Sequence, residues 1–173
     1  GGFALPLLPL QILWINLVTD IFPALALAVE PPTRDAMKQR PRPPGEALLS
    51  SNFLLLIAGQ GLMLAVITLA AYIWALSEYG EGPHARTVAL LALVGVQMGH
   101  LFNCRSRTRS AFNGFFRNPY ILIALVFVVG LQSLAVYFAP LSSLLDLVPP
   151  NTTDLLVVLT CTLLPLVTVE VIK

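Results

Sequence analysis

Residues 13–28 read LWINLVTDIFPALALA, an apolar stretch with polar residues at its centre. Its composition suits a bilayer interior, yet Asn16, Thr19 and Asp20 stand in the middle and Pro23 follows. At helical spacing the three polar residues lie on one face, because they are three and four positions apart. A carboxylate near a bilayer centre costs at least about 2.5 kcal/mol on insertion scales, so it usually faces a bundle interior and marks an ion or proton path. The stretch therefore predicts an intramembrane site at Asp20.

The whole chain has the composition of an integral membrane protein. Of its 173 residues, 57% are hydrophobic and only 11% are charged, with a mean hydropathy of +0.82. A soluble domain of this size could not bury so much apolar surface. The chain begins Gly-Gly-Phe without a Met or a basic leader segment, so we expect a piece of a longer protein and no signal peptide.

Hydropathy divides the chain into segments long enough to cross a bilayer. It predicts an all-α integral membrane protein, a bundle of five transmembrane helices over residues 8–29, 53–76, 87–102, 120–138 and 155–172. We expect the first helix to be interrupted near the ion site, because Pro23 removes one helical hydrogen bond and frees a carbonyl oxygen around Thr19. In the second span, Gly59 and Gly61 are expected to let a neighbouring helix approach closely.

Basic residues fall on one side of this arrangement. Of the ten Lys and Arg residues, four lie in residues 30–52, four in residues 103–119 and one at the C-terminus, whereas the opposite loops hold Arg86 alone. The asymmetry predicts that the two basic loops and the C-terminus are cytoplasmic. We expect the arginines after residue 103 to contact anionic lipid headgroups.

The polar residues of the first span suggest which ligand the site takes. Asn16, Thr19 and Asp20 offer an amide oxygen, a hydroxyl and a carboxylate, hard donors suited to Ca²⁺, Mg²⁺, Na⁺ or K⁺ and poor for soft metals. In the alternative, structural interpretation, Asn16 and Thr19 only bond to neighbouring helices and Asp20 is a protonated packing residue. The intramembrane carboxylate favours the functional interpretation.

Three stretches resemble a known family. The segment LPLQILWINLVTD at residues 8–20, followed by EPPTRDAMKQRPRPP at residues 30–44, resembles the sixth transmembrane helix and next loop of P-type cation-transporting ATPases, particularly the calcium pumps. VGVQMGHLFNCRSRTRSAF at residues 94–112 resembles the eighth helix, and PLVTVEVIK at residues 165–173 resembles the end of the tenth. The resemblance covers the domain formed by residues 1–173, which is only the C-terminal part of a family member.

This resemblance implies roles for four residues. Asn16, Thr19 and Asp20 match ligands of the transported ion, and Gln97 matches a further ligand on the eighth helix. At the position of Gln97, reticulum-type calcium pumps carry Glu, whereas plasma-membrane calcium pumps and sodium/potassium pumps carry Gln. The resemblance thus implies fewer calcium ions per cycle than in the two-site pumps, and a multi-pass protein of the plasma membrane.

Some positions depart from the calcium-pump pattern. Ile21 and Phe22 follow Asp20 where calcium pumps commonly have Gly, and His100 stands where the sodium/potassium branch would place an Asp. The identity of the cation therefore stays open between Ca²⁺, which the resemblance favours, and the ions of a Na⁺/K⁺-type or other P-type pump.

The implied function is cation transport by alternating access, in which phosphorylation of a domain elsewhere moves the helices and releases the ion outward. Mg²⁺ and ATP would bind only in cytoplasmic domains, because the phosphorylated Asp and the nucleotide site do not occur in these residues, and no catalytic residue is expected here. The implied partners are the rest of the same pump and membrane lipids, with no nucleic acid. Two other classes stay open: a small secondary transporter, for which no second NLVTD-like segment is found, and a non-transporting membrane scaffold.

Overall fold

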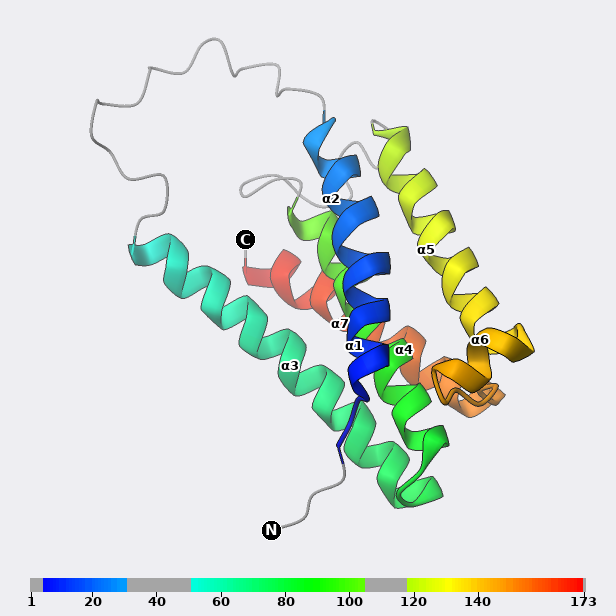
Figure 1. Ribbon diagram of the computed structural model, residues 1–173. Coiled ribbons are helices and arrows are strands. Elements are labelled where there is room, and N and C mark those ends of the chain that lie inside the picture. The colour runs from blue at the N-terminus through cyan, green and yellow to red at the C-terminus, as the bar shows by residue number, and fades with distance from the viewer. Residues whose placement is uncertain (1–4, 31–50, 105–117, 173) are drawn as a thin grey trace, which may run out of the picture.

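The computed structural model describes residues 5–30, 51–104 and 118–172, and every regular element in these ranges is helical (Figure 1). The elements in chain order are α1 (Pro9–Ile15), η1 (Asn16–Asp20), α2 (Ile21–Ala28), α3 (Ser51–Tyr79), α4 (Pro83–Cys104), α5 (Pro119–Tyr137), α6 (Ala139–Leu144) and α7 (Thr152–Ile172). Joined as Pro9–Ala28, the first three form one helix that is long and apolar enough to span a membrane, and α3, α4, α5 and α7 provide four more. The predicted all-α bundle with five spans is confirmed.

The first span is interrupted where the sequence predicts it. The segment η1, which reads NLVTD, is a π-helical turn between two α-helical segments. A π turn makes each hydrogen-bonded ring one residue longer, and single π turns inside α-helices are frequent at functional sites. Pro23, one turn later, has no N–H to offer the carbonyl group of Thr19. The interruption is therefore a widened turn rather than an unwound segment, and the chain continues as a helix through it.

The span α4 lies at the centre of the bundle. In α4, 67% of the most apolar stretch is buried, against 33% or less in each of the other four spans. It packs along both α3 and α7 and also contacts η1. Val94 and Met98 of α4 share a core cluster with Ile15 and Val18 of the first span. This contact places the candidate site beside the most buried helix.

Small residues allow α4 and α7 to cross closely. A Cβ atom added at Gly99 would collide with the backbone carbonyl group of Thr162, and one added at Gly95 would collide with the Thr162 hydroxyl group. The pair forms a small-xxx-small motif, which lets two membrane helices approach until their backbones touch. The expected contact at Gly59 and Gly61 is wrong for the described residues, since a Cβ atom at either would meet nothing within 4 Å.

The ends of the helices gather at two opposite ends of the bundle (Figure 1). The end of α2, the start of α3, the end of α4 and the start of α5 lie at one end, and the α3–α4 turn, α6 and the start of α7 lie at the other. At that turn Gly80 takes the left-handed conformation, with φ of 72°, and donates its N–H to the carbonyl group of Leu76, which stops α3. The predicted basic loops, 30–52 and 103–119, fall almost wholly outside the described residues.

Candidate cation site

Thr19 and Asp20 place two oxygen atoms side by side in η1. The hydroxyl group of Thr19 is buried and donates to the carbonyl group of Ile15 at 2.9 Å. The Oδ1 atom of Asp20 lies 3.5 Å from Thr19 Oγ1. Because a hydroxyl group has one proton and the shorter bond to Ile15 uses it, the Thr19 lone pairs remain available beside the carboxylate. Two adjacent oxygen acceptors favour a bound cation.

Asn16 and Asp20 occupy an open face of the first span. Both are exposed, and Leu17 and Ile21 beside them are 49% and 46% exposed. Among the described residues, Asp20 has no cationic partner and Asn16 makes no side-chain hydrogen bond. A carboxylate in the middle of a membrane span requires a cation or hydrogen-bond donors to stabilise its charge, so further groups are needed on this open face.

Gln97 lies on the neighbouring helix with an unused acceptor. It falls between Val94 and Leu101 of α4, which pack against the first span in two core clusters. Its Oε1 atom is buried and accepts no hydrogen bond from any described residue. Leaving such an acceptor unsatisfied costs about 1–3 kcal/mol, unless water or an ion meets it.

The structure thus places three of the four predicted residues close together and the fourth on another helix. It groups Asn16, Thr19 and Asp20 on one turn, whereas Gln97 stands on an adjacent helix and forms no hydrogen bond with any of the three. Calcium in proteins takes about six to eight oxygen ligands. The described ranges contain no group of three or more His, Cys, Asp or Glu side chains that could hold a metal. The four residues therefore present oxygen atoms on two neighbouring helices, which is fewer ligands than such a cation needs.

Polar side chains outside the predicted site hold the first span in place. Gln11 is fully buried, accepts the Leu8 N–H at 2.9 Å and donates to the carbonyl group of Leu145 at 2.9 Å. The indole Nε1 of Trp14 donates to Oε1 of Gln132 in α5 at 3.1 Å. The sequence alone did not predict these contacts, because one buried amide in an apolar run does not reveal its partner.

Asn118 makes a similar connection at the other end of the first span. Its Nδ2 donates to the carbonyl group of Ala26 at 3.0 Å and to Oε2 of Glu30 at 2.6 Å. Its Oδ1 accepts the Tyr120 N–H at 3.0 Å and so caps α5. The Asn-Pro pair at 118–119 carried a signal for this cap, since Asn is favoured before a helix and Pro at its first position.

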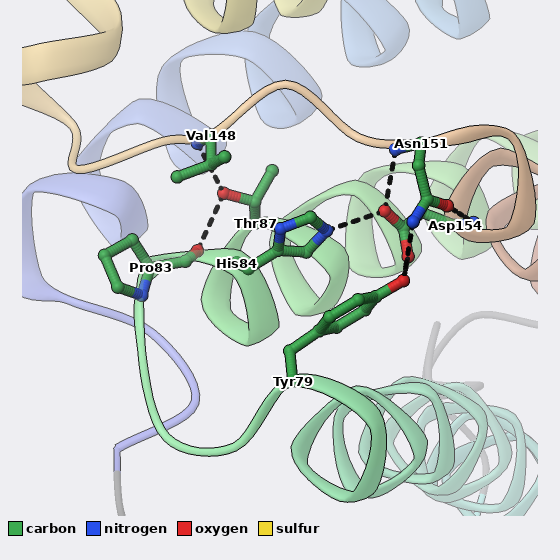
Figure 2. A network of polar contacts seen from close by, with 7 residues as sticks. All are labelled: Tyr79, Pro83, His84, Thr87, Val148, Asn151 and Asp154. Carbon is green, nitrogen blue, oxygen red and sulfur yellow. Dashed lines mark hydrogen bonds and ion pairs between the residues drawn. The ribbon is translucent and has the colours of Figure 1, made fainter.

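A second polar cluster joins α3, α4 and α7 at the opposite end of the bundle (Figure 2). Asp154 is fully buried, with Oδ1 accepting from the Tyr79 hydroxyl at 2.8 Å and Oδ2 lying 2.8 Å from Nε2 of His84. Asn151 and Asp154 also form a reciprocal capping box, at 2.8 and 2.9 Å, at the start of α7. The ring of Tyr79 stacks on that of His84 with centroids 4.0 Å apart.

Further polar contacts reinforce the same end. Thr87 donates to the carbonyl group of Pro83 at 2.8 Å and accepts the Val148 N–H at 3.0 Å (Figure 2). Arg86 pairs with Asp146 at 2.6 Å. The N-x-x-D spacing of residues 151–154 before an apolar run was a readable helix-start signal. The cluster joins three spans, and both carboxylate oxygens of Asp154 already accept hydrogen bonds within it, so it does not resemble a cation site.

Comparison with known proteins identifies relatives of the whole chain. The family described as "Cation transporting ATPase, C-terminus" matches residues 4–173. Calcium-transporting ATPase 1 of Bacillus cereus is 35% identical over 99% of the chain and 21% of its own length, and the calcium-transporting ATPase of Bacillus subtilis is 34% identical over 93% and 18%. Human calcium-transporting ATPase type 2C member 1 is 30% identical over 99% and 19%. The chain spans about a fifth of the length of these relatives.

Proposed function

Since this chain belongs to the family of cation transporting ATPase C-terminal domains, we propose that it supplies one wall of the intramembrane cation site of a pump that transports Ca²⁺. Membership makes it the C-terminal, multi-pass membrane part of a P-type cation-transporting ATPase, as the resemblance implied. The observation that carries the proposal is the π turn NLVTD, which presents a carboxylate, a hydroxyl and an amide beside a helix with an unused buried amide oxygen.

Each residue has a distinct role in the proposed site. Asp20 supplies the negative charge, Thr19 a hydroxyl oxygen, and Asn16 and Gln97 amide oxygens. The carbonyl group of Thr19, which Pro23 leaves without its usual donor, is available as a backbone ligand. An all-oxygen donor set of this kind suits a hard cation such as Ca²⁺, and the relatives named above are calcium-transporting ATPases.

Transport follows from changing this donor set. The rest of the pump, including the domains that bind Mg²⁺ and ATP, would lie outside this chain and would complete the cage from the open face of the first span. A conformational change that separates η1 from those donors lowers the affinity and releases the ion, as alternating access requires. We assign the pump to the plasma membrane, on the resemblance of Gln97 to pumps of that membrane.

The test of the site is the Asp20→Asn variant in the full-length pump. We expect it to abolish Ca²⁺-dependent phosphorylation from ATP, because the substitution removes the charge while keeping the shape. Glu81→Gln, at an exposed position in the α3–α4 turn, is the matched control and should leave the Ca²⁺ dependence unchanged. Unchanged Ca²⁺ dependence in Asp20→Asn would refute the assignment, and a response to Na⁺ or K⁺ in place of Ca²⁺ would reassign the transported ion.

A further inference from the structure

We propose that Trp14 and Gln132 are positioning residues for the cation site, through a hydrogen bond by which α5 holds the interrupted span in register. The inference rests on the proposed function, because it concerns how the ligands of η1 are kept in place. Neither side chain is proposed to touch the cation. Their bond instead fixes the turn that leads into Asn16.

The bond lies directly before the π turn. Trp14 stands in the last turn of α1, two residues ahead of Asn16, and its indole Nε1 donates to Gln132 Oε1 at 3.1 Å. Gln132 is only 6% exposed and lies within the mostly apolar helix α5. An indole N–H within a membrane needs an acceptor, and Gln132 supplies it.

α5 also contacts the first span beyond the π turn. Phe22, two residues after Asp20, packs edge-on against Phe127 of α5 with ring centroids 4.5 Å apart. Farther along, Asn118 at the start of α5 donates to the carbonyl group of Ala26. The helix α5 therefore contacts the interrupted span on both sides of η1. We call this pair of contacts a splint, because it holds the two helical segments that flank the π turn.

Such a splint addresses a specific weakness of the first span. A π turn followed by Pro23 has fewer regular backbone bonds to define its geometry. Ligands must nevertheless be held within about 0.5 Å of their productive positions to bind well. Because the side chains of Asn16 and Asp20 are exposed and make no hydrogen bond to another described helix, their positions depend on how the flanking turns are held.

The chemistry of Gln132 argues against a purely packing role. Its Nε2 is buried and donates to no described residue. An apolar residue of the same shape would avoid that unsatisfied group, so packing alone favours replacing the amide. The hydrogen bond from Trp14 is the one interaction among the described residues that requires a polar side chain here.

The test is a double-mutant cycle in the full-length pump with Trp14→Phe, Gln132→Met and the two combined. Ca²⁺-dependent phosphorylation is measured for both its half-saturating concentration and its maximal level. Each single variant should raise the half-saturating Ca²⁺ concentration by about threefold to tenfold, the effect of one lost hydrogen bond. The half-saturating Ca²⁺ concentration of the double variant should not exceed that of the more affected single variant, because the same bond is lost in all three. Ser133→Ala, which removes only a bond to the Val129 carbonyl group in the same helix, should change neither value.

The outcomes separate this inference from the proposed function. A lowered maximal level at an unchanged half-saturating concentration would show a merely structural role and would overturn the inference, as would additive effects of the two substitutions. If Gln132→Met does not accumulate in the membrane, the half-saturating concentration of Trp14→Phe decides alone. Asp20→Asn is measured beside them: if it retains Ca²⁺ dependence, the proposed function fails, whereas its loss together with unshifted positioning variants overturns only the splint.

Discussion

Asp20 stands on a membrane-spanning helix with an exposed side chain, and its Oδ1 lies 3.5 Å from Thr19 Oγ1. Gln97 in α4 keeps a buried oxygen that accepts no hydrogen bond from the part of the chain that the structure describes. Both features carry a free-energy penalty in an apolar environment that packing does not offset. A bound cation would offset both penalties at once, so the chemistry of single residues accounts for the proposed site.

A close contact with the α7 backbone also requires glycine at position 99. We expect Gly99→Ala to destabilise the chain by about 1–3 kcal/mol, because the added Cβ must push the α7 backbone away at Thr162. Gly59→Ala is the matched control: it lies in an exposed part of α3 with nothing within 4 Å and should stabilise by about 0.5–1 kcal/mol. Thermal unfolding of the detergent-purified chain measures both. A Gly99→Ala variant as stable as Gly59→Ala would contradict the close α4–α7 crossing.

At the scale of elements, hydrogen bonds at the two ends hold the spans together. Asn118 caps α5 and bonds to the end of α2, while Asp154 accepts the Asn151 N–H in the capping box of α7 and bonds to α3 and α4. Each of these residues thus satisfies backbone groups at the start of its own helix and also forms hydrogen bonds to another span. Because a buried polar group without its partner is costly, these contacts favour the packing in which their partners meet.

Asp154 should therefore contribute more to stability than a carboxylate on the surface. We expect Asp154→Ala to lower the free energy of unfolding by about 2–4 kcal/mol, because it removes the capping box and leaves the Tyr79 hydroxyl and His84 without their acceptor. Asp146→Ala breaks the more exposed pair with Arg86 and should cost less than about 1 kcal/mol. The same unfolding measurement compares the two variants. Equal losses of unfolding free energy in the two variants would mean that the hydrogen bonds of Asp154 do not hold the three spans together.

At the scale of the whole molecule, the spans alternate in direction between two ends. The helix ends that flank the basic loops point to the same end of the bundle, opposite α6 and the α3–α4 turn (Figure 1). This arrangement agrees with the distribution of Lys and Arg along the chain. From the positive-inside rule we predict that Cys104 lies toward the cytoplasm and Glu81 on the opposite side of the membrane.

Sided labelling tests that orientation. In the full-length pump, a Cys104→Ala, Cys161→Ala, Glu81→Cys variant should react with a membrane-impermeant maleimide in intact cells, since Glu81 is exposed. A Cys161→Ala variant that keeps the exposed Cys104 should react only after the membrane is permeabilised, provided that the other native cysteines of the pump are replaced in both variants. Labelling of Cys104 in intact cells would reverse the proposed topology.

The sequence by itself determined the membrane class, the five spans and the place of the interruption. Each depends on local quantities: apolar run length sets a span, and Pro23 behind a polar triplet disturbs the helix at that point. The candidate ligands could be predicted for the same reason, since a carboxylate within an apolar segment is easily recognised in the sequence.

Only the tertiary structure decided which residues meet. The packing glycines are Gly95 and Gly99 rather than Gly59 and Gly61, because closeness depends on which helix faces which. The contact between Trp14 and Gln132 joins residues 118 positions apart, and no local pattern specifies such a pair. A helix presents its side chains in every direction, and the partner of each becomes defined only when the whole bundle packs.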